Sequence, residues 1–171
     1  MSTLYVDNLR SNLSTKITVP SGNTLDVSGG TLVPSAGAVM QIITAKDGIA
    51  TFNSSSWTSV VSTSITPSSA SSKIYIHVCC PCYGGGEVEV KGGARIRRDS
   101  TTIRELQSVW YRESTGAFKG SSSSMVVLDS PNTTSSVTYD AQVIRRQGSN
   151  NLHLDDTNNG EWVITLMEIA G

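Results

Sequence analysis

From residue 39 onward, apolar residues alternate with polar ones or form short continuous runs, and turn-forming residues bound each run. This spacing is typical of β-strands, and a helical period of about 3.6 residues is nowhere sustained for three turns. The runs occupy residues 39–45, 57–65, 73–80, 87–98, 102–113, 124–130, 136–147, 151–154 and 161–169. The pattern predicts an all-β fold, an antiparallel sandwich or barrel, and we expect a jelly-roll-like β-sandwich head over residues 39–171.

The composition agrees with a small, polar β-protein. Of the 171 residues, 37% are hydrophobic and 16% are charged, whereas about 45–50% apolar and roughly 25% charged residues are usual in globular chains. Ser, Thr, Gly and Asn, the residues of turns and solvated strands, make up the difference. The net charge of −1 predicts no general attraction to nucleic acid or to an anionic membrane.

No apolar run approaches the roughly 20 residues that are needed to cross a bilayer. The first residues, MSTLYVDNLRSNL, include Asp7 and Arg10 and lack the continuous apolar core of a secretory signal. We therefore expect a chain that folds in the cytoplasm where it is made and does not insert into a membrane.

Residues 1–38 differ from the rest, because their apolar residues come in small groups separated by turns such as PSGN at 20–23. Ordering the backbone costs roughly 1–2 kcal/mol per residue, and two buried aliphatic side chains in eight residues return about 3–6 kcal/mol. A single copy therefore cannot hold this segment in one conformation. It is either disordered, or packed against other copies or a neighbouring protein.

The regular recurrence of these groups favours packing, as an extended, short-stranded shaft of three chains wound around a common axis. The residues that would make the trimer and attachment contacts are Leu4, Val6, Leu9, Ile17, Val19, Leu25, Val27, Leu32 and Val33.

Five stretches carry a resemblance to a known family: MSTLYVDNL, ITVPSGNTLDVSGGTLVPSAGAVMQII, SITPSSASSKIYIHV, MVVLDSPNTTSSVTYDAQV and WVITLMEIAG. In these stretches the chain resembles the small tail-fibre and head-fibre structural proteins of tailed bacteriophages, of the kind found in cyanophages and other phages of aquatic bacteria. The stretches span most of the chain and occur in the family's order.

The resemblance implies a homotrimer on the exterior of the virion. Residues 1–38 would attach to the virion or form the shaft, through contacts with other tail, neck or capsid proteins. The head, residues 39–171, would project outward for attachment to the host surface, with cell-surface polysaccharide as its partner. The alternative is a purely structural decoration of the capsid or neck that binds no receptor. Neither hypothesis involves nucleic acid or membrane insertion.

The stretch KIYIHVCCPCYGGG at 73–86 holds four potential metal ligands: His77, Cys79, Cys80 and Cys82. On a strand, His77 and Cys79 point to one face and Cys80 points to the other, unless Pro81 turns the chain. Zinc sites usually use two separated cysteine pairs, and this chain has no second pair. We expect small buried hydrophobic residues here rather than a metal site or a disulfide.

No arrangement of residues predicts catalysis, and we expect neither enzymatic activity nor a cofactor. The candidate acid pair of a glycan-cleaving spike comes from Asp155, Asp156 and Glu161, in and beside the loop DDTNNG. Such loops are far more often solvated turns, in which Asp and Asn favour the backbone geometry.

Basic residues gather on neighbouring strands. Asp99-Ser100-Thr101 is predicted to form a turn that folds the strand ending in ARIRR back on the strand that contains TIRE. Glu105 and Asp99 would then partly neutralise the arginines. One interpretation is a solvated sheet face with cross-strand ion pairs. The other is a patch for an acidic surface glycan, because arginine binds anions bidentately. The candidate contacts are Arg97, Arg98, Arg104 and Tyr111, with loops 83–87, 98–102, 114–124 and 155–160 around them.

Overall fold

A computed structural model describes residues 21–22, 34–47, 52–84, 90–112, 119–148, 152–153 and 161–171, with the backbone alone at 82–84, 90, 108–112, 119–122 and 152–153. The chain divides into two units, Met1–Val33 and Pro34–Gly171. All nine residues that the sequence assigns to the shaft lie outside the described residues, so the trimeric shaft stays a prediction.

The described part of the second unit consists of strands joined by turns and loops. They are β1 (Val39–Asp47), β2 (Thr58–Ile65), β3 (Lys73–Gly84), β4 (Val90–Arg98), β5 (Thr101–Arg112), β6 (Lys119–Asp129), β7 (Val137–Gln147), β8 (Leu152–His153) and β9 (Trp162–Ile169). Each strand falls on one of the predicted runs, which confirms the all-β class. Within the described ranges there is no helix that could cross a membrane.

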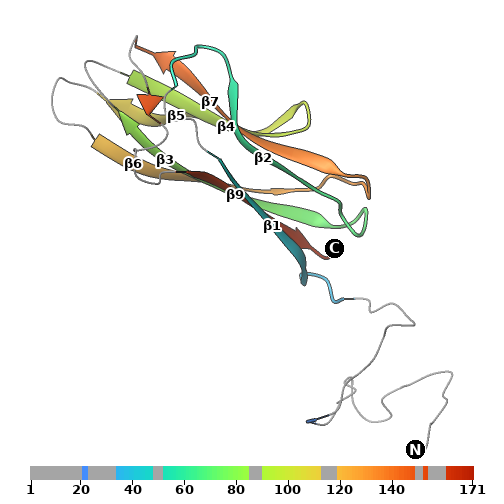
Figure 1. Ribbon diagram of the computed structural model, residues 1–171. Helices are drawn as coiled ribbons and strands as arrows, with labels where there is room; N and C mark the ends of the chain where they lie inside the picture. The colour runs from blue at the N-terminus through green and yellow to red at the C-terminus, as the bar shows by residue number, and fades with distance from the viewer. Residues whose placement is uncertain are drawn as a thin grey trace, which may run out of the picture. The chain divides into compact units, whose positions relative to one another are not determined.

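The strands pair as one long hairpin that is folded back on itself. β4 and β5 meet at its tip, and the antiparallel pairs β3–β6, β2–β7 and β1–β9 follow in turn away from the tip. Successive pairs fall alternately into two sheets, with the orders β1-β9-β3-β6 and β2-β7-β4-β5, and β8 pairs with the end of β3. The two sheets form the layers seen in Figure 1. This strand order is that of a jelly roll, and it confirms the predicted sandwich.

The hydrophobic core lies between the two sheets. Inward-facing side chains recur at every second position of a strand, as in Trp162, Ile164 and Leu166 of β9, which have no exposed surface. Burying each such aliphatic side chain contributes about 1.5–3 kcal/mol. The indole Nε1 of Trp162 donates a hydrogen bond to the carbonyl oxygen of Pro81 at 3.2 Å, so its polar atom is satisfied inside the core.

One predicted turn is wrong: the serine cluster at 121–124 lies within β6, opposite residues 79–82 of β3. Serine favours turns locally, but the ladder with β3 supplies backbone partners and decides the conformation. Pro81 does not turn the chain either, and continues β3. It lies beyond the described β3–β9 ladder, which ends where Cys79 faces Val163, so its missing N–H leaves that ladder intact.

A carboxylate occupies one core-facing position of β9. Glu168 has no exposed surface, and its Oε1 accepts hydrogen bonds from the backbone nitrogen and the hydroxyl of Ser68 at 2.7 and 2.6 Å. Its Oε2 accepts from Nε2 of Gln41 at 2.7 Å, and the same nitrogen donates to the carbonyl of Thr66 at 2.8 Å. Burial alone would raise the pKa of Glu168, but the hydrogen bonds from Ser68 and Gln41 outweigh it and lower the pKa to about 2. The carboxylate thus ties β1 and β9 to the β2–β3 connection.

We expect Glu168→Gln to lower the free energy of unfolding by about 2–3 kcal/mol at pH 7, because an amide cannot accept all of these hydrogen bonds. The folded-state pKa of about 2 lies below the ordinary value of 4.5. The stabilisation is therefore complete above pH 4.5 and is lost as the pH falls towards 2, so the loss at pH 3 should be less than about half of that at pH 7. Urea unfolding at the two pH values measures it.

Glu161→Gln is the matched control, because Glu161 pairs with Lys46 at 2.7 Å while their side chains are 44% and 68% exposed. An exposed pair of this kind contributes less than about 1 kcal/mol. Equal losses at pH 7 and pH 3 for Glu168→Gln would contradict the role given to its charge.

Candidate functional site

The two outer faces of the sandwich have opposite chemistry. The outer face of the sheet β2-β7-β4-β5 carries arginines, carboxylates and an aromatic ring, and we call it the arginine face. It consists of Trp57, Arg95, Arg97, Glu105, Asp140, Gln142 and Arg146. The outer face of the sheet β1-β9-β3-β6 is mainly hydrophobic, and we call it the apolar face.

Trp57 lies just before the edge strand β2, and its ring contacts two arginines of the arginine face. The guanidinium carbon of Arg95 is 4.3 Å from the centroid of its ring, and that of Arg146 is 5.4 Å away. Both distances fall within the range of cation–π attraction, which contributes about 0.5–1 kcal/mol at exposed sites. The ring therefore holds together arginines from two strands, β4 and β7.

Polar side chains complete this arrangement. Arg95 Nε donates to Oε1 of Gln142 at 2.7 Å, and Nε2 of Gln142 donates to Oδ2 of Asp140 at 2.6 Å. Arg146 Nη2 donates to Oε1 of Glu105 at 2.5 Å. The predicted neutralisation by Glu105 is thus confirmed, although its partner is on β7. Arg95 and Arg97 are two residues apart on β4 and so share this face. Burial, followed by the charge of Arg97, lowers the pKa of Arg95.

Of the predicted glycan contacts, Arg97 lies on the arginine face opposite Asp140 of β7, and Arg104 is exposed on β5. Neither makes an ion pair with a described residue. The side chain of Tyr111 lies outside the described residues. The place of Trp57 in this site was not predicted from the sequence. Its neighbour Thr58 pairs with Val143, which is far away in the chain, and no local pattern indicates that contact.

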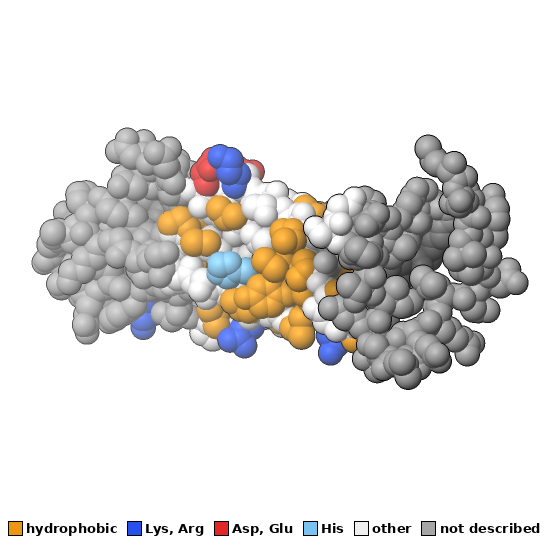
Figure 2. All heavy atoms as spheres, turned by 90° about the horizontal axis from the view of Figure 1, so that it is seen from below, with side chains coloured by type: hydrophobic (Ala, Val, Ile, Leu, Met, Phe, Trp, Pro, Cys, Tyr) orange, Lys and Arg blue, Asp and Glu red, His pale blue; other side chains and the backbone are white. Residues whose placement is uncertain are grey.

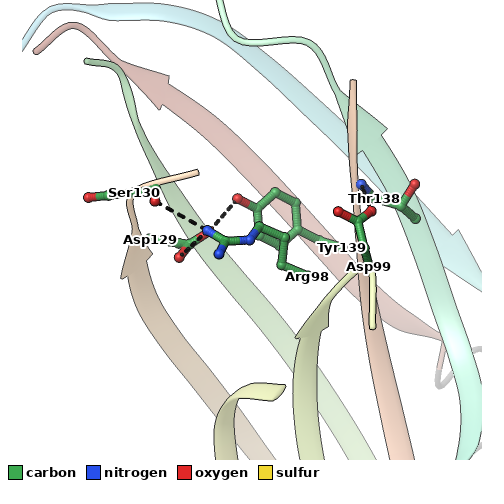
Figure 3. A network of polar contacts seen from close by, with 6 residues as sticks. All are labelled: Arg98, Asp99, Asp129, Ser130, Thr138 and Tyr139. Atoms are coloured by element: carbon green, nitrogen blue, oxygen red, sulfur yellow. Dashed lines mark hydrogen bonds and ion pairs between the residues drawn. The ribbon is translucent and has the colours of Figure 1, made fainter. Parts of the chain in front are cut away.

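Arg98 points away from the arginine face and joins the two sheets. Its Nη1 contacts Oδ2 and Oδ1 of Asp129 at 2.8 and 3.0 Å and the carbonyl of Ser130 at 3.2 Å, while the hydroxyl of Tyr139 donates to Oδ2 of Asp129 at 2.7 Å (Figure 3). Arg98 and Tyr139 belong to one sheet and Asp129 belongs to the other. Burial, and then the hydrogen bond to Asp129, raises the pKa of Tyr139. We call these three residues the inter-sheet clamp.

The turn after Arg98 forms as predicted, with Asp99 in a left-handed conformation at φ 49°. Its carboxylate does not pair with an arginine. Oδ1 accepts from the backbone nitrogen of Thr138 at 3.0 Å, and the backbone nitrogen of Asp99 donates to the Thr138 carbonyl at 2.8 Å. Aspartate tolerates this conformation better than most residues, and the two bonds hold the turn against β7.

The cysteine stretch shows the predicted alternation. Cys80 is buried in the core, and burial, together with the neighbouring Cys79, raises its pKa, which makes it unreactive. Cys79 is half-buried and shares the outer face with His77. The side chain of Cys82 is not among those described. Among the residues whose side chains the structure describes, no three His, Cys, Asp or Glu groups are placed to hold a metal ion.

The apolar face is built from cross-strand rows. One row runs from edge to edge of the sheet through Ile42, Met167, Tyr75 and Leu128, which face one another in register on β1, β9, β3 and β6. The most exposed members of the face are Val39 (53%), Met40 (37%), Ile42 (59%), Val126 (45%) and Leu128 (54%). Figure 2 shows hydrophobic side chains gathered on this side of the molecule, in patches around a histidine.

Among the described side chains of this face, the charged ones lie at its ends, where Lys46 pairs with Glu161 and Lys73 begins β3. Covering the exposed halves of the five most exposed side chains would release roughly 4–7 kcal/mol of hydrophobic free energy. A sheet face in contact with water normally alternates with polar residues. The apolar run MVVL, and the run WVITLM that only Thr165 interrupts, are the signal by which this face could have been predicted from the sequence.

Comparisons with known proteins do not assign the chain to a family: no family model and no curated protein matches it. Among solved structures, it is similar to those titled infectious bursal disease virus Gt strain and Gx strain, with 13% and 12% sequence identity and TM-scores of 0.41 and 0.42. The alignments cover 90% of this chain but 43% of each of those chains. The chain thus spans less than half their length.

We expect Asp129→Ala to lower the free energy of unfolding by about 2–4 kcal/mol, because it leaves the buried hydroxyl of Tyr139 without its acceptor and Arg98 without its anion. Tyr139→Phe, which keeps the Arg98–Asp129 pair, should cost about 1 kcal/mol. Ser64→Ala is the control, since it removes an exposed contact with Thr138. Urea unfolding compares them, and a loss for Asp129→Ala no larger than that of the control would refute the clamp.

Proposed function

We propose that this chain is a virion structural protein, a homotrimeric fibre subunit of a bacteriophage. Residues 1–38 attach it to tail, neck or capsid proteins, and the head, residues 39–171, projects from the exterior of the particle to bind a host-surface glycan. The resemblance of five stretches of the sequence to phage fibre proteins supports this proposal. The described head supports it with a rigid sandwich that presents a charged and aromatic face.

The glycan assignment rests on a difference between two groups of arginines: those that other side chains hold in place, and those without an ion-pair partner among the described residues. Arg95 and Arg146 are held by the Trp57 ring and by Gln142 and Glu105. Arg97 and Arg104 have no ion-pair partner among the described residues. Arg97 is thus a guanidinium group without an ion pair to a described residue, on the same face as arginines that are fixed in place, and it suits a ligand that carries its own anions. Arg104 pairs in register with Ile96 and is exposed on the edge strand β5.

The ligand class follows from this chemistry. Arginine binds sulfate, phosphate or carboxylate groups through two parallel hydrogen bonds, and bacterial surface polysaccharides carry such groups. A single exposed contact is weak. Three heads on one fibre multiply weak contacts, because once one head is bound the others meet their sites at high effective concentration.

The proposed role is not enzymatic. Glu161, one of the carboxylates considered for glycan cleavage, is exposed and engaged by Lys46. The other two, Asp155 and Asp156, lie outside the described residues. Binding by the arginine face requires no acid–base pair, no cofactor and no metal.

The second candidate function is structural decoration of the capsid or neck without receptor binding. The ion pair and hydrogen bonds on the arginine face favour it to some extent, because solvated sheet faces commonly carry such pairs without binding anything. In that case Arg97 and Arg104 would only make the surface more soluble and would bind no ligand. Binding measurements separate the two functions.

We expect the double variant Arg97→Ser, Arg104→Ser to weaken binding to dextran sulfate at least about tenfold, because each lost charged hydrogen bond is worth roughly 1.5–3 kcal/mol when shielded from water. The melting temperature should stay nearly unchanged, because neither arginine has an ion-pair partner among the described residues. Surface plasmon resonance with immobilised dextran sulfate, and with neutral dextran as the reference, measures the binding.

Lys46→Ser is the matched control, since it removes one positive charge from the other sheet. It should leave the affinity within about twofold, apart from the screened long-range charge effect. If the double variant and the wild type bind alike, or if neither binds dextran sulfate, the glycan assignment fails and structural decoration is favoured.

A truncation tests the attachment role of the N-terminal segment. Removing residues 1–32 should leave a folded head, because the core described here lies wholly within the unit Pro34–Gly171. The truncated chain should fail to enter virions, which immunoblots of purified particles can measure against the full chain. Normal incorporation of the truncated protein would show that attachment does not depend on this segment.

A further inference from the structure

We propose that the apolar face is the surface through which the heads of separate copies of this chain contact one another. The inference rests on the trimer of the proposed function and deepens it, because it names the part of the head that the copies share. Three features carry it: the chemistry of the face, its size, and its position in the chain.

The chemistry excludes a charged ligand. The row Ile42–Met167–Tyr75–Leu128 is apolar from one edge of the sheet to the other. The neighbouring row, Thr44–Thr165–His77–Val126, has three polar members but no carboxylate, lysine or arginine. A surface of this kind gains free energy by meeting another apolar surface. Copies of one chain can meet here without opposing like charges.

The size of the face suits a contact that acts together with a second one. Four strands about 4.8 Å apart, each described over about 26 Å, make a face of roughly 500 Å² in projection. In a trimer the three faces bury roughly 1,500 Å² in all, or about 500 Å² for each pair of copies, whereas a total of about 1,000 Å² marks a biological rather than an incidental interface between two chains. The contact is small enough that it would act together with a second one, such as the predicted shaft.

The position in the chain favours a second copy over an unrelated protein. Val39 and Met40, which open the apolar face at β1, directly follow the segment whose apolar groups need other copies to be buried. Copies held together by that segment would bring their β1 strands close to one another. The same association can then cover both sets of hydrophobic side chains.

Thiol labelling of the full-length protein tests this inference, because Cys79 lies on the apolar face and is half-buried rather than buried in the described chain. The wild type and the double variant Ile42→Lys, Val126→Lys are treated with a maleimide, and mass spectrometry locates the label. Both substituted side chains are about half exposed, at 59% and 45%, so the head should still fold. Ser62→Lys, exposed on β2 of the other sheet, is the matched control.

We expect the wild type and Ser62→Lys to sediment as trimers in which Cys79 is protected. In the double variant Cys79 should react at least about 100-fold faster, because lysine ammonium groups cannot be buried in an apolar contact. Circular dichroism should show the same strand content in all three proteins.

Two results would refute the inference, and they differ in whether the proposed trimer is kept. A trimer in which Cys79 reacts as fast as in the double variant would refute this interface but keep the trimer, and would leave the apolar face to another virion protein. A monomeric wild type would refute both the interface and the proposed trimer. If Cys79 were protected in that monomer, the chain's own residues 1–33 would be the cover.

Discussion

Antiparallel pairing between strands that are distant in the chain is the constraint on which the rest of this structure depends. β4 and β5 are joined by a tight turn, held by Asp99 and Thr138, and the pairing then proceeds outward to β1 and β9 at the two ends of the head. Each later strand pair forms either after the inner pair next to it has formed or by closing a long loop. We therefore expect this topology to fold slowly. The same pairing decides which side chains share a face.

The two outer faces follow from the placement of strand pairs in alternate sheets. β1, β3, β6 and β9 carry apolar residues at both inward and outward positions, and the pairing gathers all four into one sheet. β4 and β7 place Arg95, Arg97 and Arg146 outward and residues such as Ala94, Ile96 and Ala141 inward, and both strands fall in the other sheet. The strand order, as much as the amino-acid composition, therefore makes one outer face apolar and the other rich in arginine.

Local pattern was enough to predict the strands, the all-β class, the Asp99 turn and the neutralising role of Glu105, because each depends on alternation or on near neighbours. It was not enough for the serines at 121–124, which adopt strand geometry through pairing with β3. Nor could it show that Trp57 stacks with Arg95 and Arg146, or that Arg98 reaches Asp129 across the core. These contacts join residues that are far apart in the sequence, and no local pattern indicates that they meet.

Arg97 and Arg98 show how alternation separates binding from stability. Adjacent residues on a strand point to opposite faces, so Arg98 enters the inter-sheet clamp while Arg97 stays on the arginine face. The clamp lies at the same end of β4 as Arg97 and fixes that part of the strand between both sheets. If copies of the chain cover their apolar faces against one another, as we propose, the opposite sheet of every copy is turned outward. The association that hides the hydrophobic face would then display one arginine face per copy, each already held rigid by its clamp.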